Sequence, residues 1–280
     1  MTQLVSGLVT EQDLADYDRD GAIMVRGAVS AAWIERLRAD IPRAIEGMLR
    51  MREAMGRPRP EGPAHHDVLM LFKRDPLWRA FALESGLALL AADVMQSSKV
   101  IVFGDHLLVK EPGTQNTTPW HHDLPYWPIR GPRMASIWVA LDSVRLETGA
   151  LEYIAGSHKW GRWFKPVDFM GKAEIPGADL ETIPDFDAER AQHRIISWDL
   201  EPGDVLVHHP LVVHGAGANS RTDRARRAIS IRYVGDETRF VGSSLMGGNE
   251  GPFALPLQPG DPVEKDDVHP TAWVRDGADA

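Results

Sequence analysis

The sequence predicts a mainly β fold with flanking helices, arranged as an antiparallel jelly-roll. Three observations support this prediction. From Lys99 onward the chain carries short runs rich in valine, isoleucine, leucine and aromatic residues, each bounded by glycine, proline, asparagine or aspartate, which is typical of short strands. No long helical pattern alternates with these runs, which disfavours a parallel α/β sheet. The first hundred residues instead have apolar residues at helical spacing, so we expect helices packed outside the β core.

The N-terminal part, about residues 8–98, is expected to be mainly helical. Thr10 followed by Asp13 matches a capping box at the start of a short helix, and the segment 23–26 (IMVR) resembles a short strand. Ser30 can cap a second helix, in which apolar residues recur at helical spacing and Pro42 predicts a kink.

A second pair of signals divides the rest of this helical part. Residues 51–66 contain three prolines and two glycines and are expected to form a loop. Asp75 and Pro76 provide an N-cap and a first-turn proline for a helix reaching about Met95. The sequence therefore predicts a loop after the second helix and one further helix before the β core.

The chain is interpreted as one domain over residues 1–280, because it shows no internal repeat and no low-complexity tract. The jelly-roll core is expected over about 99–240. Residues 161–197 form a polar, proline-containing insertion, and an insertion of this length is typical of a lid over a site or of a disordered loop. Residues 241–280 are expected to form a C-terminal extension rich in glycine and proline.

Composition excludes several classes of partner and site. The net charge of -9 disfavours nucleic acid and acidic membrane surfaces, and the cluster Arg221, Arg224, Arg226 and Arg227 is the local exception. Cysteine is absent, so a metal would need nitrogen and oxygen ligands. The N-terminus has no basic segment followed by an apolar one, and no stretch is apolar for the length of a bilayer, so a soluble cytoplasmic protein is expected.

The stretch TTPWHHDLPYW, residues 117–127, places a candidate metal site in what reads as a strand. In an extended chain His121 and Asp123 share one face, and His122 points to the other. A third ligand is available at His214, in the stretch GDVLVHHPLVVHGAG. Two histidines and one carboxylate with open remaining positions form the facial triad of non-haem iron(II) oxygenases. His208 and His209 are expected to support the strand before His214 by hydrogen bonding.

An arginine follows the third candidate ligand in an alternating segment, RRAISIRYV. Arg226 shares a strand face with Ser230, whereas Arg227 faces the other way. A guanidinium on the inner face of a sheet needs a partner, and a carboxylate held by two hydrogen bonds suits it. Arg227 or Arg224 could take this role if the preceding loop shifts the register by one residue.

Together these motifs resemble the phytanoyl-CoA dioxygenase family of iron(II)- and 2-oxoglutarate-dependent oxygenases. The similarity covers most of residues 8–235. It rests on His121-x-Asp123, then His214-Gly-x-Gly-x-Asn219, then Arg226-Arg-Ala-Ile-Ser230, and on the connecting phrases LLVKEPGT and ALDSVRLETGALEYIAGSH. The resemblance implies a double-stranded β-helix core, also called a cupin-type jelly-roll, with iron bound at one open end.

Carried over residue by residue, the resemblance implies that His121, Asp123 and His214 bind Fe(II) and that Arg226 pairs with the distal carboxylate of 2-oxoglutarate. Further candidates are two cosubstrate contacts, Thr118 and Ser230, and three substrate contacts, Tyr126, Trp127 and Trp138. No catalytic group is expected beyond the metal ligands.

The expected activity is a dioxygenase that consumes 2-oxoglutarate and O2, releases succinate and CO2, and hydroxylates or otherwise oxidises a small organic metabolite. Asp123 argues against halogenation, because related halogenases replace this carboxylate. Desaturation stays possible. The alternatives are a cupin-like metal-dependent isomerase or hydrolase, and a catalytically silent jelly-roll that only binds. The family's range of substrates leaves the metabolite open, and the sequence does not indicate an oligomeric state.

Overall fold

Two antiparallel sheets form the centre of the protein in the computed structural model, which describes residues 4–167, 180–242, 256–265 and 268–276. The larger sheet contains, in spatial order, β1 (Ala22–Val25), β9 (Val205–His208), β6 (Met134–Ala140), β11 (Arg226–Val234), β3 (Lys99–Lys110) and β13 (Thr271–Val274). A seventh strand, β2 (His65–Leu69), pairs with β3 beyond the part that β13 covers.

The smaller sheet faces the larger one and contributes two of the candidate metal ligands. Its strands in spatial order are β4 (Thr118–His121), β10 (His214–Ala216), β7 (Leu151–Ile154) and β8 (Ile195–Ser197). A short separate ladder joins β5 (Ile129–Arg130) to β12 (Arg239–Phe240). The predicted mainly β, antiparallel jelly-roll with flanking helices is confirmed, with sheets that stay open at their edges.

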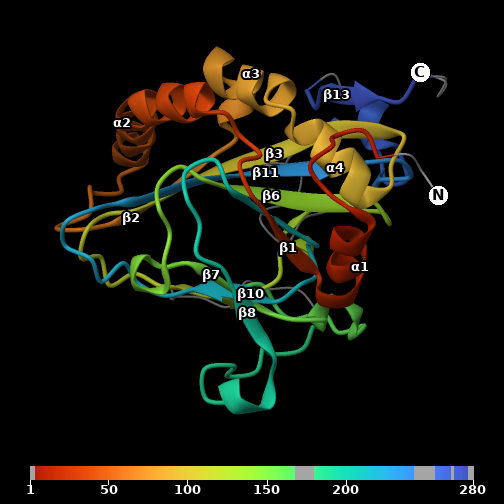
Figure 1. The fold of residues 1–280 in the computed structure, drawn as a ribbon. Coiled ribbons are helices and arrows are strands. Elements are labelled where there is room, and N and C mark those ends of the chain that lie inside the picture. Colours follow the sequence, from red (N-terminus) through yellow and green to blue (C-terminus); the bar gives the residue numbers. More distant parts are fainter. Residues whose placement is uncertain (1–3, 168–179, 243–255, 266–267, 277–280) are drawn as a thin grey trace.

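Helices cover the outer face of the larger sheet. Figure 1 shows α2 (Ala31–Ala54), α3 (Pro76–Glu84) and α4 (Leu87–Met95) on one side of this sheet and the smaller sheet on the other, while α1 (Glu11–Asp20) lies beside β1. The two larger hydrophobic clusters accordingly lie mainly between the helices and the larger sheet and between the two sheets, and a third, smaller cluster joins Ile154, Val213, Phe164 and Phe186.

Side chains along β11 point alternately toward the helices and toward the smaller sheet. Ile229, Ile231 and Tyr233 are buried against the helical layer, and the Tyr233 hydroxyl donates to the carbonyl oxygen of Ala82 at 2.7 Å. Ala228 belongs to the layer between the sheets. Because strand side chains alternate between faces, Arg226, Ser230 and Arg232 point to the same side as Ala228 and line the cavity there.

The expected helix caps are present. Thr10 and Asp13 form a capping box, Ser30 accepts from the N–H of Trp33, and Asp75 accepts from the N–H of Leu77.

Three boundaries differ from the sequence expectation. The helix expected from Pro76 to Met95 is two helices, because Gly86, in the left-handed region at φ 87°, changes the chain direction between them. Helix α2 continues through Pro42 as far as Ala54, since Leu37, Ile41 and Ala44 pack continuously into the core. The expected loop at 51–66 is therefore shorter at both ends, and its last residues enter β2.

Parts of two expectations lie outside the described residues. In the insertion 161–197, Phe164 and Glu181 form an isolated parallel bridge, and residues 168–179 are not described, so the lid stays a prediction. In the extension 241–280, the described residues include β13, which adds a strand to the larger sheet.

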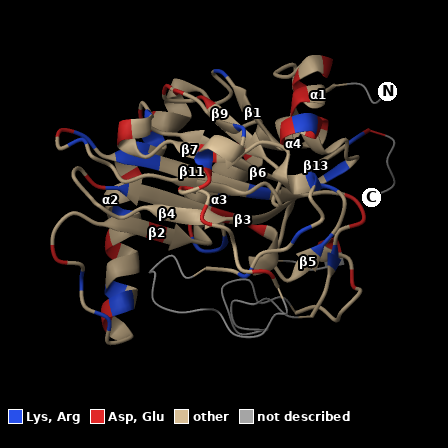
Figure 2. Ribbon diagram, turned by 90° about the horizontal axis from the view of Figure 1, so that it is seen from below, with Lys and Arg blue, Asp and Glu red and all other residues tan. Residues whose placement is uncertain are grey.

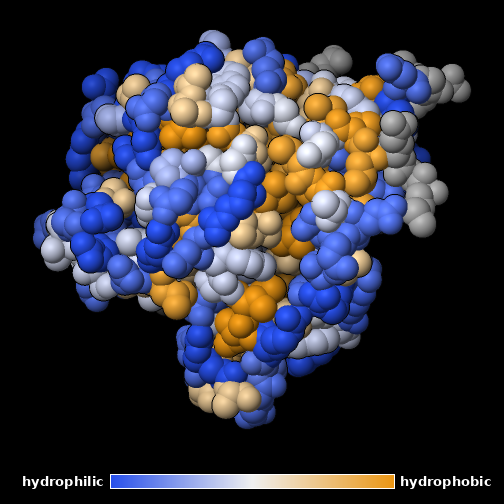
Figure 3. Space-filling model, viewed as in Figure 1, coloured by the Kyte–Doolittle hydropathy of each residue, from blue (hydrophilic) through white to orange (hydrophobic). Residues whose placement is uncertain are grey.

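The outer surface is mixed in charge and largely hydrophilic. Helix α1 is mainly acidic, with Arg19 as its basic residue, whereas α2 carries residues of both signs (Figure 2). The space-filling view shows hydrophilic side chains over most of one face with a hydrophobic patch beside α4 (Figure 3). Within the described residues, no helix combines the length and apolar character needed to cross a bilayer.

A buried carboxylate ties the start of β9 to the N-terminal part, and this contact gives a first prediction. Asp204 accepts hydrogen bonds from Gly27 N at 2.8 Å, Glu201 N at 2.8 Å and Arg26 Nη1 at 2.5 Å. We expect Asp204→Asn to lower the free energy of unfolding by about 2 kcal/mol near neutral pH, because a carboxylate accepts these bonds more strongly than an amide.

The pH dependence has a definite sign. Although burial raises the pKa of Asp204, the hydrogen bonds and Arg26 lower it below the ordinary value of 3.8. The stabilisation is therefore present above 3.8 and is lost as the pH falls through the lower folded-state value. Urea denaturation at neutral and acidic pH measures this difference, with the exposed Asp199→Asn as the control. An equal loss in the two variants would contradict the expectation.

Candidate active site

The three candidate ligands converge between the two sheets. His121 ends β4 and His214 begins β10, and these two residues are paired directly across the antiparallel ladder. Their ring centroids are 4.2 Å apart. His121 Nε2 is 3.8 Å from Asp123 Oδ1, and one ligand atom from each of the three residues lies within 4.8 Å of the others. All three side chains are buried.

The chain reaches this geometry by a turn, so the expectation that His121 and Asp123 share a strand face is wrong. Strand β4 ends at His121, and Asp123 has helical backbone angles, φ -70° and ψ -40°, at the start of a short 3-10 turn. Pro125 in this turn has no N–H for a sheet ladder, and Leu124 N donates instead to Pro210 O at 3.0 Å. The turn brings the carboxylate of Asp123 back beside His121.

Backbone carbonyls fix the tautomer of both histidines. His121 Nδ1 lies 2.9 Å from Pro119 O, and His214 Nδ1 lies 3.0 Å from Val212 O. A carbonyl oxygen only accepts, so each Nδ1 carries the proton and each Nε2 presents its lone pair as the ligand atom. Burial lowers the pKa of both imidazoles, which favours the neutral form that binds metals.

The carboxylate of Asp123 is kept ionised by its surroundings. Burial by itself would raise its pKa, but His208 and the positive charge of Arg232 lower the pKa well below its ordinary value. Ser136 Oγ donates to Asp123 Oδ2 at 3.1 Å, and His208 Nε2 lies 3.6 Å from the same oxygen. A buried anion with two neutral imidazoles is a donor set that fits a divalent iron, manganese or zinc ion.

A cavity of about 270 Å³ opens from these ligands between the sheets. Arg226 lies in its lining, is 2% exposed, and among the described residues its Nε has no hydrogen-bond partner. Burial lowers the pKa of Arg226 to about 10, so the guanidinium is still charged at neutral pH. Its Cζ atom lies 5.5 Å from the ring centroid of Trp138. The buried cation is therefore placed to receive an anionic ligand.

Lys110 and His65 lie in line with Arg226 on the next two strands of the larger sheet, β3 and β2. Lys110 of β3 is paired with Arg226, and His65 of β2 is paired with Lys110. Lys110 Nζ donates to the carbonyl oxygen of Gly217, whereas His65 lines the cavity and its Nε2 has no hydrogen-bond partner within the described part of the chain. Burial lowers the pKa of His65 to about 3, so His65 is a neutral group at this end.

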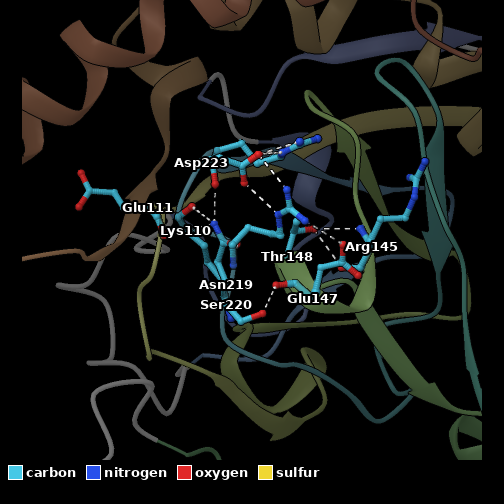
Figure 4. A network of polar contacts seen from close by, with 10 residues as sticks. Lys110, Glu111, Arg145, Glu147, Thr148, Asn219, Ser220 and Asp223 are labelled. Carbon is cyan, nitrogen blue, oxygen red and sulfur yellow. Dashed lines mark hydrogen bonds and ion pairs between the residues drawn. The ribbon is translucent and has the colours of Figure 1, made fainter.

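The loop before β11 is held by a network that fixes where Arg226 begins the strand. Asn219 Nδ2 lies within hydrogen-bond distance of Lys110 O and Glu111 O, each at 3.2 Å, and of Arg224 O at 2.9 Å. Figure 4 shows Asn219 beside Lys110 and Glu111, and Ser220 against Glu147. The asparagine of the His-Gly-x-Gly-x-Asn motif thus joins the loop to the end of β3 and sets the register of β11.

The other predicted site residues are also placed around the cavity. Its lining includes Thr118, Tyr126, Trp127, Trp138 and Ser230. Ser230 is paired with Trp138 across β11 and β6, which puts both on the inner face of the larger sheet.

The two alternative arginines lie elsewhere. Arg227 Nη2 pairs with Asp142 Oδ1 at 2.6 Å on the opposite face of β11, and Arg224 pairs with the exposed Asp223.

The neighbouring histidines behave differently from one another. His122 points away from the ligands, as expected, and its Nε2 accepts from Phe164 N at 2.8 Å. His209 also lies apart, where its Nδ1 accepts from Leu211 N at 3.1 Å. His208 lines the cavity, hydrogen-bonds to the Tyr153 hydroxyl at 3.2 Å, and stands beside Asp123. It therefore belongs to the immediate surroundings of the candidate metal site.

Sequence reasoning missed one side of the cavity. The additional lining residues with polar side chains are Arg52, His65, Asp67, His106, His208 and Arg232. Alternation along β11 could have identified Arg232, which shares the face of Arg226 and Ser230. The residues of β2 give no such signal, because the predicted loop at 51–66 includes the first two of them and the sequence indicates no element for residues 67–69.

The residues that form this site lie within a stretch of the chain that matches a known protein family. The family model for phytanoyl-CoA dioxygenase matches residues 17–228, which include all three candidate metal ligands and Arg226. The chain belongs to the phytanoyl-CoA dioxygenase family. Among similar members of this family, a probable phytanoyl-CoA dioxygenase of Caenorhabditis elegans is 25% identical over 241 residues, covering 80% of this chain and 75% of that protein. The peroxisomal phytanoyl-CoA dioxygenase of Rattus norvegicus is 24% identical over 238 residues, covering 80% and 68%.

Solved structures of similar fold extend over nearly the whole chain of this phytanoyl-CoA dioxygenase family member. The non-haem α-ketoglutarate-dependent carbocyclase SnoK from nogalamycin biosynthesis superposes with a TM-score of 0.72 at 21% identity, covering 97% of this chain and 99% of that one. EctD from S. alaskensis superposes with a TM-score of 0.67 at 18% identity, covering 94% and 87%. At these identities the likeness establishes the jelly-roll fold.

Proposed function

We propose that this protein is an iron(II)- and 2-oxoglutarate-dependent dioxygenase that hydroxylates or otherwise oxidises a small organic metabolite, with release of succinate and CO2. The observation that carries the proposal is the buried triad of His121, Asp123 and His214 at a cavity that also contains the buried cation of Arg226. Family membership supports the same reading.

The metal would be bound by His121 Nε2, His214 Nε2 and one oxygen of Asp123. Ser136 would fix the orientation of the Asp123 carboxylate through its hydrogen bond. Bound iron(II) supplies the oxidative decarboxylation of 2-oxoglutarate with O2 and the oxidation of the substrate. The protein contributes three ligands on one side and leaves the other side open for the reacting molecules.

Arg226 would pair with the distal carboxylate of 2-oxoglutarate. A guanidinium suits a carboxylate because two parallel N–H groups match its two oxygens. Thr118 and Ser230, both in the cavity lining, are the proposed additional contacts with the cosubstrate. Trp138, expected from the sequence to contact substrate, is better assigned to the cosubstrate, because it lies against Arg226 and its Nε1 has no partner among the described residues.

Tyr126 and Trp127 would border the substrate. Both follow the metal motif directly and are buried in the cavity lining, and the Tyr126 ring centroid is 6.1 Å from that of His121. They give the cavity an apolar wall close to the ligands, which favours a small, partly apolar molecule.

Anaerobic calorimetry tests whether iron and 2-oxoglutarate share one site. Because the cosubstrate would chelate the metal as well as pair with Arg226, we expect it to bind the iron-loaded protein at least about tenfold more tightly than the metal-free protein. Zinc-loaded protein serves as a control for chelation without redox chemistry. Equal affinity with and without metal would contradict the proposal.

A further inference from the structure

A second buried arginine lines the cavity, and the proposed binding of 2-oxoglutarate does not involve it. Arg232 is 6% exposed and lines the same cavity as Arg226, six residues further along β11. Six residues of strand separate their Cα atoms by roughly 20 Å. Arg226 is in register with Lys110 and His65, whereas Arg232 is in register with Ser136, the residue that donates to Asp123. The two arginines therefore serve different ends of the cavity.

A short chain of side chains orients Arg232. Its Nη2 lies 3.3 Å from His106 Nδ1, and His106 Nε2 lies 2.9 Å from Asp67 Oδ1. Its Cζ atom is 5.5 Å from the ring centroid of Trp127. His106 and Asp67 belong to the cavity lining as well. The guanidinium is thus held between an imidazole on β3 and an indole next to the metal motif.

The charges of the lining favour an anionic substrate. Three arginines, Arg52, Arg226 and Arg232, face two carboxylates, Asp67 and Asp123, so the lining has an excess of one positive charge when histidines are counted as neutral. Iron(II) and the dianion of 2-oxoglutarate cancel each other, so loading the site leaves this excess unchanged. A substrate with a single negative charge would balance it, and charge balance is favourable in a water-poor cavity.

We propose that the substrate carries a carboxylate, and that Arg232 binds it beside Trp127 while the hydrogen-bond chain from Asp67 through His106 positions the guanidinium. This inference rests on the proposed function and adds the substrate class to it. A carboxylate suits the planar fork of arginine, and a cavity of about 270 Å³ accommodates a small acid. An acid anchored here would lie along Tyr126 and Trp127, next to the metal ligands.

Arg232 also acts on Asp123, because its charge is one of the influences that lower the pKa of that ligand. A purely electrostatic role would affect metal binding alone. A substrate-binding role would also discriminate between an acid and a neutral molecule of the same shape. The test therefore compares acids with their amides instead of relying on loss of activity.

The experiment uses full-length protein loaded anaerobically with iron(II) and saturating 2-oxoglutarate, which occupies Arg226. The probes are phenylacetate, 3-phenylpropanoate and hexanoate, each compared with its primary amide by calorimetry. We expect at least one acid to bind roughly tenfold or more tightly than its amide, as one charge-assisted pair would provide. Arg232→Met should abolish this preference, and Arg232→Lys should restore part of it. Arg133→Met, at a partly exposed arginine outside the cavity lining, should keep it.

Two results would overturn the inference: acids and amides binding equally or not at all to the loaded wild-type protein, or an acid preference that survives in Arg232→Met. If Arg232→Met lowers only iron affinity and leaves the acid preference unchanged, the electrostatic role alone is correct. Failure of the wild-type protein to bind iron or 2-oxoglutarate is a separate result, detected in the loading step, and it counts against the proposed function.

Discussion

Asp123→Ala is expected to abolish stable iron binding. The substitution removes the only anionic ligand of the proposed triad and leaves two neutral imidazoles with the nearby positive charge of Arg232. Changes to residues that merely support a ligand cost about 10- to 100-fold in metal affinity, so loss of a ligand should cost about 100-fold or more. Iron content after anaerobic loading and desalting measures the effect.

The control for this variant is Asp199→Ala, whose side chain is 69% exposed and lies outside the cavity. It should retain the wild-type iron content. Asp123→Ala also removes one of the two carboxylates, Asp123 and Asp105, whose charges act on the buried Arg232, so circular dichroism should establish that the variant is folded before iron content is compared. Undiminished iron in folded Asp123→Ala would show that the metal, if one binds, is held by other residues.

Replacing Arg226 is expected to have a large effect on the affinity for 2-oxoglutarate. Arg226→Leu should weaken 2-oxoglutarate binding to the iron-loaded protein by about 100-fold, which corresponds to about 3 kcal/mol for losing one side of a buried charged pair. Iron binding itself should persist, because Arg226 is not among the ligand residues. Arg226→Lys should recover only part of the affinity, since an ammonium cannot present two parallel N–H groups.

Arg227→Leu is the matched control for Arg226→Leu. Arg227 is the adjacent residue on the same strand, but it faces outward and pairs with Asp142. Its replacement should reduce stability while leaving the affinity for 2-oxoglutarate within about twofold of wild type. A loss of 2-oxoglutarate affinity in the Arg227 variant equal to that in the Arg226 variant would contradict the assignment by strand face.

The sequence could predict those features that depend on local patterns. Alternation along RRAISIRYV placed Arg226 inward and Arg227 outward, and the structure shows both orientations. Bounded apolar runs predicted the antiparallel sheets, and short capping motifs predicted where the helices begin. In each case the deciding interactions join residues close together in the chain or repeat with the period of the element.

The features that escaped prediction depend on contacts between distant segments. Strand β2 forms because residues 65–69 pair with residues 106–110, and no local pattern specifies that pairing. Without β2 the cavity wall with His65 and Asp67 could not be foreseen. The candidate metal ligands are a different case. The structure brings His121 and Asp123 close together, although the strand on which the sequence argument relies ends at His121.

The central claim is that iron(II) and 2-oxoglutarate bind together at His121, Asp123 and His214. Anaerobic titration of the metal-free protein with both, followed by visible absorption, tests it most directly, because chelation of 2-oxoglutarate to iron(II) gives a weak metal-to-ligand charge-transfer band. We predict that the band appears in the wild-type protein, is absent in Asp123→Ala, and requires much higher 2-oxoglutarate in Arg226→Leu. A wild-type protein without the band at saturating iron(II) and 2-oxoglutarate would contradict the account.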